Sequence, residues 1–579
     1  MRALAGVFLL AAAACCWLAQ PAPVQADDKA TAAGAALSAT IDREIDGVLK
    51  RDGIKPAPRS SDAEFIRRVY LDTVGMPPSY DEAVAFLDDT GKDKRNKLID
   101  RLLNDPRFGR HFADHWSVLL TPRNANALSG GTYFADWMAG RVNAGVSFAQ
   151  VIREIITARG DIADNPAVVP WFRDGQGELI TDMSGKLTRS LMGVQIQCAE
   201  CHDHPYDEAI SQKTFQGMVA FLAPSRATVD QRRQPPEIVV RDDPATVNRI
   251  FEAIKNYDKL RKDQQAQVDF YRPYVNPVTL TGAKAEEKPE LWRDELAAWW
   301  IDKANLQTRR YVANRMWFMA FGTGLVNPPD DFNPLNEPSH PQLLDALAAE
   351  LLRSGWDVRG LYRAILRSET YQRSSAGGGG QRWHYARYPV RALTPEQFLT
   401  SLIGLMEPAQ RNRLITDGFE NTFVAARAQF KRNAEQRQDY SFDEDRLNRF
   451  EQRFRKVDGR WWMARMSAGR YVSLSTDDEN TAADGFSLSI NQALAVMNGE
   501  FTNNLAGSGE STLLGHILKR HEDPGVRFDA IYLTILSRKP TDTERQRWRD
   551  LIKGERNVLP LVEDLIFALL MTTEFGTNH

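Results

Sequence analysis

Helix-forming signals recur along this 579-residue chain and restrict it to a mainly α-helical fold. Apolar residues at helical spacing begin at Leu37, Ile41 and Ile45, and Gly53 ends that stretch. Capping boxes, in which Ser or Thr stands three residues before Glu or Gln, open further helices at Ser79–Glu82, Thr394–Gln397 and Thr541–Glu544. The best strand candidate is the short run 236–240. We therefore expect many helices and a few short strands.

The first 26 residues predict a signal peptide. Arg2 supplies a positive start, residues 7–14 are apolar, and the small residues before Asp27 suit cleavage after Ala26. The apolar run is too short for a permanent membrane anchor. We expect an exported, periplasmic protein, with lipid attachment through Cys15 as the alternative.

The rest of the chain has the composition of a globular protein. It is 43% hydrophobic and 26% charged, with a net charge of −3. This balance offers no basic excess to attract nucleic acid. A second apolar run of membrane-spanning length is absent, so we expect no transmembrane segment after signal cleavage. Oligomeric state and enzyme activity stay open at this point.

Changes in composition divide the mature chain into two domains. Residues 27–36 are rich in Ala, Thr and Gly and predict a flexible N-terminal segment. A first domain follows over 37–225, a connecting segment with some structure over 226–288, and a C-terminal helical domain over 289–579. The Arg- and Glu-rich stretch 425–465 predicts solvated, ion-paired helix.

One short motif carries the strongest chemical signal. Cys198 and Cys201 are the only cysteines left after signal cleavage, and His202 follows directly. The C-x-x-C-H spacing is that of covalent haem attachment, in which two thiols bond one porphyrin and the imidazole binds its iron. The motif predicts haem c with His202 as the proximal ligand, and a role in electron transfer or redox support with a partner protein.

The second axial ligand is not fixed by the sequence. His204 is two residues from His202, which separates their backbones by only about 7 Å, too little to reach the opposite porphyrin face. The distal candidates are Met192, Met218, His111 and His115. His204 and Asp207 are candidates for a second site, binding an ion or a propionate.

Two alternatives give the same residues another role. Cys198, Cys201, His202 and His204 could bind zinc together with Asp207, although the usual second ligand pair is missing. The cysteines could also form a CxxC disulfide of the thiol-oxidoreductase type. In either case the chain would be a scaffold or binding protein without haem.

The residues around this motif resemble a known family. The run 197–205 (QCAECHDHP) is similar to the signature of the planctomycete cytochrome c-like family (domain of unknown function 1549), as are 65–72 (FIRRVYLD), 75–78 (GMPP) and 107–116 (RFGRHFADHW). The C-terminal half resembles the companion planctomycete domain (domain of unknown function 1553), through 314–317 (NRMW), 329–332 (PDDF), 498–501 (NGEF), 536–538 (LSR) and 574–579 (EFGTNH). The resemblance implies a cytochrome-like protein and no defined activity.

Overall fold

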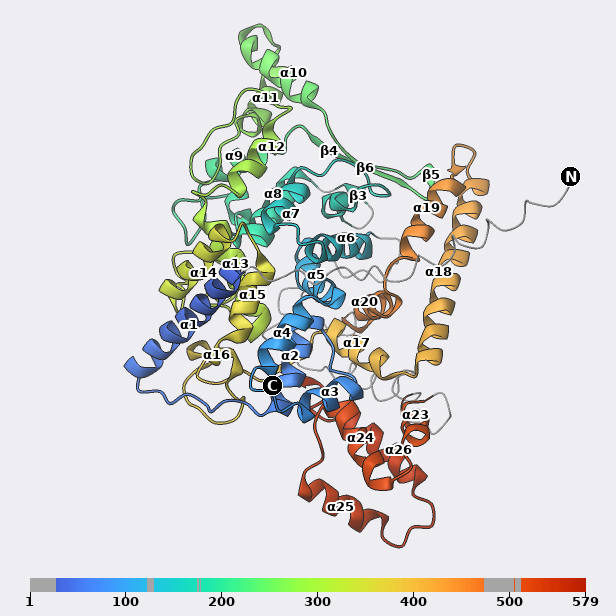
Figure 1. The fold of residues 1–579 in the computed structure, drawn as a ribbon. Helices are drawn as coiled ribbons and strands as arrows, with labels where there is room; N and C mark the ends of the chain where they lie inside the picture. Colours follow the sequence, from blue (N-terminus) through green and yellow to red (C-terminus); the bar gives the residue numbers. More distant parts are fainter. Residues whose placement is uncertain (1–27, 122–129, 174–175, 178, 473–504, 506–511) are drawn as a thin grey trace, which may run out of the picture.

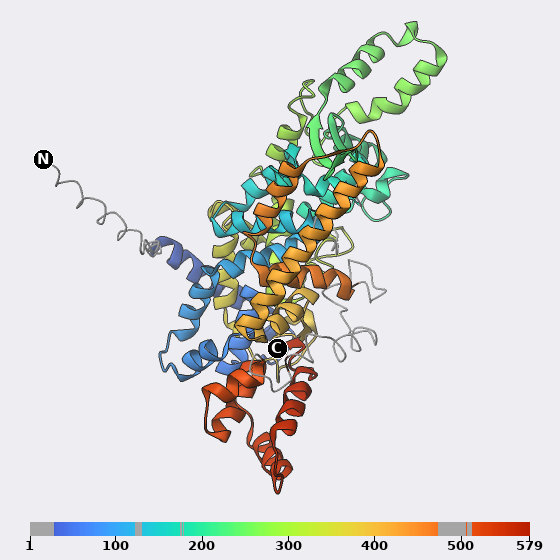
Figure 2. The same cartoon turned by 90° about the vertical axis from the view of Figure 1, so that its right-hand side faces the viewer.

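The computed structural model describes residues 28–121, 130–173, 176–177, 179–472, 505 and 512–579. Helices dominate this part of the chain and the strands are short, which confirms the predicted fold class. The helices form an elongated body, with α10 (Pro244–Lys255) and α11 (Lys262–Tyr271) projecting at one end and the C-terminal helices at the other (Figures 1 and 2). The predicted signal peptide, residues 1–26, lies outside the described residues.

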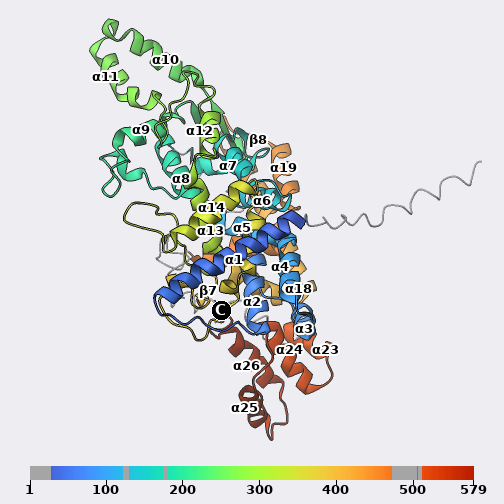
Figure 3. The ribbon, with the colours of Figure 1, turned by 60° about the vertical axis from the view of Figure 1, so that its left-hand side comes forward.

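Nine α-helices of the described residues precede residue 225. Helix α1 crosses the body against α14 and α15 (Figure 3). It begins at Asp28, so 28–36, predicted to be flexible, are helical instead; the Ala-rich composition there suits a helix. The helices are α1 (Asp28–Arg51), α2 (Asp62–Val74), α3 (Tyr80–Asp88), α4 (Lys94–Leu103), α5 (Pro106–Leu120), α6 (Gly131–Asn143), α7 (Phe148–Ile156), α8 (Ile180–Met192) and α9 (Gln212–Ala220).

The C-terminal half is built in the same way. The long helix α18 runs beside the body and ends near the three-stranded sheet (Figures 1 and 2). The helices are α12 (Trp292–Trp300), α13 (Leu306–Phe321), α14 (Pro341–Arg353), α15 (Val358–Arg367), α16 (Glu369–Gln372), α17 (Pro395–Leu405), α18 (Pro408–Gln436), α19 (Glu444–Phe454), α20 (Gly459–Val472), α23 (Leu513–Arg520), α24 (Pro524–Leu536), α25 (Asp542–Ile552) and α26 (Leu559–Leu570).

The largest sheet lies in the middle of the sequence. Its strand order is β1-β6-β4 and all pairs are antiparallel, with Thr228 opposite Val239 and Gly160 opposite Val240. The strand predicted around 236–240 is β6. The other strands form two-residue pairs. The strands are β1 (Gly160–Asp161), β2 (Phe172–Arg173), β3 (Gln176–Gly177), β4 (Ser225–Asp230), β5 (Arg233–Gln234), β6 (Glu237–Asp242), β7 (Arg391–Ala392), β8 (Ser441–Phe442) and β9 (Thr577–Asn578).

Local signals in the sequence fixed several helix ends correctly. The three predicted capping boxes form at Ser79, Thr394 and Thr541, where each side chain accepts a hydrogen bond from the backbone N–H three residues on. The charged stretch 425–465 forms the C-terminal part of α18, all of α19 and the start of α20. Arg427 there pairs with Glu444 at 2.5 Å and with Glu451 at 3.2 Å, as predicted for an ion-paired helix.

The two halves share the larger of the two hydrophobic cores found in the described residues. This core runs from Leu37 to Leu533 in the sequence. The Trp116 ring lies 4.6 Å from the Phe148 ring and 6.0 Å from the Tyr311 ring, between centroids, which joins α5 and α7 to α13. In the described residues, no helix combines the length and apolar character needed to cross a bilayer.

A buried polar junction joins the start of the fold to its C-terminus. Asp72 on α2 is fully buried and accepts hydrogen bonds from Asn578 (2.7 Å), Tyr371 (2.7 Å) and Tyr388 (2.9 Å), and its carboxylate also pairs with Arg391. The neighbouring arginines 67 and 68 donate to backbone carbonyls of the last six residues. The segments 65–72 and 574–579 therefore meet in space.

Candidate functional site

The C-x-x-C-H motif lies on a surface loop held between two helix ends. Helix α8 ends at Gly193, which has φ +72° in the left-handed region that suits glycine. A Cβ there would come within 2.5 Å of Cδ2 of Tyr311, so the chain turns in close contact with α13. The next helix, α9, begins after Ser211, whose side chain accepts a hydrogen bond from the Thr214 N–H. These ends fix the loop 194–211.

The two thiols stand on one short 3₁₀ helix, η2 (Gln197–Glu200), and on the residue after it. Ala199 between them is fully buried, as is Ile196 just before the turn. Cys198 and Cys201 are both exposed and both free thiols. The small buried alanine thus anchors the turn to the core, while the sulfur atoms are accessible from solvent.

His202 is exposed beside the thiols and has a defined tautomer. Its Nδ1 lies 2.7 Å from the backbone carbonyl oxygen of Asp203. A carbonyl only accepts hydrogen bonds, so Nδ1 carries the proton of the neutral ring and Nε2 keeps its lone pair. A metal-binding histidine commonly has this arrangement, with one ring nitrogen donating to a carbonyl and the other facing the metal.

His204 has the opposite arrangement. Its Nδ1 accepts hydrogen bonds from the backbone N–H groups of Tyr206 (3.3 Å) and Asp207 (3.1 Å), so in the neutral ring Nε2 carries the proton. The Asp207 carboxylate accepts the N–H of Ala209 at 3.0 Å. Both predicted second-site residues therefore brace the loop itself.

Two further hydrogen bonds connect the loop to α9. The Asp203 carboxylate accepts the backbone N–H of Gln212 at 2.8 Å, and the Gln212 side chain donates to the carbonyl of Glu200 at 3.0 Å. The described residues contain no group of three or more His, Cys, Asp or Glu side chains arranged to hold a metal ion. The sulfur atoms of Cys198 and Cys201 are not bonded to each other in this structure.

The four distal candidates lie in other surroundings. Met192 on α8 and Met218 on α9 are each only 1% exposed and pack in the core. His111 is buried on α5, and burial lowers its pKa to about 3. Its ring lies against Gly75 and 4.7 Å from the ring of His115, between centroids.

Helix α8 contacts α5 near its C-terminal end, whereas His111 lies closer to the start of α5. Ser190 donates to the Leu119 carbonyl at 2.7 Å, and Leu119 is eight residues, or about 12 Å, beyond His111 on α5. The structure therefore gathers the thiols and His202 on one exposed turn, whereas the distal candidates Met192, Met218 and His111 are buried.

A large hollow opens beside the loop. It has a volume of about 710 Å³ and lies among η2, α10, α11 and the 3₁₀ helix η4 (Arg272–Val275). Glu200, which stands between the two cysteines, lines it. The pKa of Tyr274, also on its wall, is raised by burial and then by the negative charges of Glu200 and Cys201. The hollow therefore adjoins the motif, although neither cysteine lines it.

The lining of the hollow combines apolar side chains with two arginines. Leu179 and Phe270 are 68% and 67% exposed, unusual values for large apolar side chains. Arg226 and Arg249 also line the hollow. The Arg226 guanidinium donates to the backbone carbonyl of Ser225, and the Arg249 guanidinium donates to the hydroxyl of Thr246, each at 2.9 Å. This lining suits a flat apolar molecule with acidic groups.

Sequence reasoning missed the hollow because its walls come mainly from the segment 226–288, predicted to be a connecting segment with some structure. That segment forms most of the sheet and the projecting helices α10 and α11 (Figure 1). One signal was available: the aromatic residues Phe270, Tyr271 and Tyr274 follow one another in a segment otherwise rich in Lys and Gln.

Comparison with known families covers most of the chain. Residues 40–227 match the family PSCyt2, described as a protein of unknown function (DUF1549), and residues 292–552 match PSD1, a protein of unknown function (DUF1553). The order is the one that the sequence motifs predicted, and the first match contains the whole C-x-x-C-H loop. No curated protein and no solved structure matches the chain.

Proposed function

This chain carries a DUF1549 domain followed by a DUF1553 domain, and we propose that it is an exported, periplasmic c-type cytochrome-like protein. In this proposal Cys198 and Cys201 hold one haem through their sulfur atoms. His202 binds its iron through Nε2. The bound haem supplies one-electron redox chemistry, and the protein transfers electrons to or from a partner protein.

The tautomer of His202 is the observation that carries the proposal. The Asp203 carbonyl accepts a hydrogen bond from Nδ1–H of His202, which leaves the Nε2 lone pair for a metal, directly beside two free, exposed thiols. The same hydrogen bond fixes the orientation of the imidazole. Neighbouring His204 cannot replace it, because its Nδ1 is occupied by two backbone donors.

The surroundings support a haem at this position. The exposed turn gives a porphyrin an open approach, and the hollow beside it offers apolar and aromatic surface. Arg226 and Arg249 supply positive charge for the propionates. A haem held at this exposed turn would keep one porphyrin edge accessible to solvent, which suits electron exchange with a partner protein.

Paired substitutions test the assignment of the ligand. The full chain is produced in a host with haem-attachment machinery, and His202→Asn is compared with the matched control His204→Asn, whose amide oxygen can still accept the loop hydrogen bonds. We expect His202→Asn to change the visible spectrum of the iron and His204→Asn to leave it as in the wild type.

Equal spectra for the two variants would refute the role of His202. Covalent haem that survives in the double variant Cys198→Ala/Cys201→Ala would refute the attachment site. A colourless wild-type protein that holds one zinc ion per chain would support the scaffold alternative instead.

A further inference from the structure

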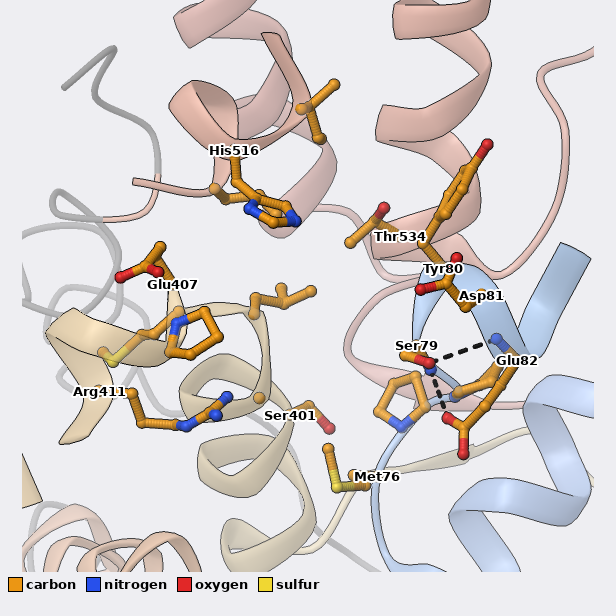
Figure 4. Close-up of a pocket in the computed structure, with 18 of the residues that line it drawn as sticks. Met76, Ser79, Tyr80, Asp81, Glu82, Ser401, Glu407, Arg411, His516 and Thr534 are labelled. Carbon is orange, nitrogen blue, oxygen red and sulfur yellow. Dashed lines mark hydrogen bonds between the residues drawn. The ribbon is translucent and has the colours of Figure 1, made fainter. Parts of the chain in front are cut away.

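A second cavity lies away from the loop, near the C-terminal helices, and shares no lining residue with the hollow at η2. It has a volume of about 460 Å³ and is formed where α3, α17, α18, α23 and α24 meet (Figure 4). Residues of both matched families line it, from the GMPP segment at 75–78 to the helices after 512. Its apolar surface comes from Met76, Leu405, Met406, Leu513 and Ile517.

Two arginines on the cavity wall make few direct contacts with acidic side chains. Among the described residues, the Arg411 guanidinium has no hydrogen bond and no ion pair. Arg460 has a single ion pair, with Asp458 at 3.9 Å. The same carboxylate also accepts the backbone N–H groups of Arg460 and Trp461 and pairs with Arg110 at 3.2 Å. Its charge is therefore shared among several donors.

The two guanidinium groups also lie close enough to repel each other. Burial lowers the pKa of Arg411 first, and the positive charge of Arg460 lowers it further, while the negative charges of Asp458 and Glu407 offset part of this shift. Keeping two like charges together at a partly buried site costs free energy in the empty protein, and a bound anion would recover it. In Figure 4 the Arg411 side chain extends into the cavity toward Ser401, with His516 on the opposite wall.

The acidic residues of the cavity are already engaged elsewhere. Glu407 accepts the backbone N–H groups of Ala409 (2.7 Å) and Gln410 (3.1 Å) at the start of α18. Asp81 pairs with Arg520, at 3.1 Å for one of its oxygens. Glu82 closes the capping box at Ser79 and contacts Arg107 at 3.3 Å, as Figure 4 shows for the capping box. Over the lining residues, the four arginines 107, 411, 460 and 520 exceed the three carboxylates 81, 82 and 407 by one positive charge.

We propose that this cavity binds a small organic oxyanion, a carboxylate, sulfate ester or phosphate ester carried on an apolar or cyclic body. Arg411 and Arg460 bind the anionic group through charge-assisted hydrogen bonds. Met76, Leu405 and Met406 contact the body of the molecule. The cavity volume lies in the range usual for small-molecule sites.

Calorimetric titration of the full mature protein tests this site. The probes are benzoate, phenyl sulfate and phenyl phosphate, which share a ring and differ in the anion, with benzyl alcohol as the neutral probe. We expect at least one oxyanion to bind, at least tenfold more tightly than benzyl alcohol, and to bind more weakly as salt is added. The three anionic probes then identify which group the site prefers.

Variants of α18 place the binding on Arg411. Arg411→Gln should weaken binding of the best probe by about tenfold to a hundredfold, because the loss of a charge-assisted hydrogen bond lowers the affinity by that factor. Arg413→Gln is the matched control, since Arg413 is exposed on the same helix, and its effect should be less than about twofold. Arg411→Lys should restore part of the affinity, and Arg460→Gln should repeat the loss if Arg411→Gln folds poorly.

The proposal is overturned if none of the three oxyanions binds, if benzyl alcohol binds as tightly as they do, or if Arg413→Gln weakens binding as much as Arg411→Gln. These results are independent of haem attachment, because the cavity and the C-x-x-C-H loop share no residue.

Discussion

The buried pair between Asp72 and Arg391 allows a sharp prediction about how the two halves hold together. Asp72 belongs to the first matched family and Arg391 to the second. The Asp72 side chain is 0% exposed and the Arg391 side chain 9% exposed. Arg391→Met keeps most of the side-chain stem but leaves the carboxylate with neutral donors alone, from Tyr371, Tyr388 and Asn578.

The size of the effect follows from burial. A buried carboxylate that loses its cation is destabilised by about 3–5 kcal/mol, and neutral hydroxyl and amide donors offset only part of this. The double variant Asp72→Asn/Arg391→Met removes both charged members of the pair. Its loss of stability should therefore fall short of the sum of the two single losses by about 2–3 kcal/mol.

Urea unfolding, followed by circular dichroism and tryptophan fluorescence, measures both quantities. The matched control is Arg353→Met, which breaks a surface pair with Glu350 and should cost less than about 1 kcal/mol. A loss for Arg391→Met no larger than that of the control would refute the reasoning, as would strictly additive losses in the double variant.

Two further predictions concern acid stability and the turn before the loop. Hydrogen bonds from Arg538 hold the pKa of Glu544 at about 2, below its usual 4.5, so its stabilising contribution is full above pH 4.5 and is lost as the pH falls toward 2. Arg538→Gln should flatten the decline of the unfolding midpoint in that window, and an unchanged decline would contradict this. Gly193→Ala should destabilise the fold more than Gly53→Ala, measured as the urea midpoint. Both add left-handed strain of about 1–2 kcal/mol, but only the Cβ at 193 meets Tyr311. Equal midpoints would show that the close approach costs nothing.

Local sequence signals predicted the helical fold well. Capping boxes and apolar spacing depend on residues three or four apart, so Ser79, Thr394 and Thr541 could be placed without knowledge of the tertiary structure. The strand β6 was found for a similar reason, because β-branched residues cluster within it. The helical state of residues 28–36 was missed, since Ala and Gly in that stretch permit both a helix and a flexible segment.

Contacts between distant residues could not be predicted in the same way. The junction of Asp72 with Arg391 and Asn578 joins residues more than 300 positions apart in the sequence. No local sequence pattern around these residues indicates which of them will be in contact. The same limit applies to the candidate site. The sequence identified Cys198, Cys201 and His202 by spacing, but the tautomer of His202 depends on the backbone path at Asp203. The cavity at Arg411 required helices from both halves.

Covalent haem attachment at Cys198 and Cys201 is the central claim and can be measured directly. The intact mass of the exported wild-type protein is determined after acid-acetone extraction, which removes haem that is not covalently bound. The proposal predicts a protein heavier by one haem, with the added mass on the peptide that contains Cys198 and Cys201 and absent from the double alanine variant. A folded, exported wild-type protein with no added mass would contradict it.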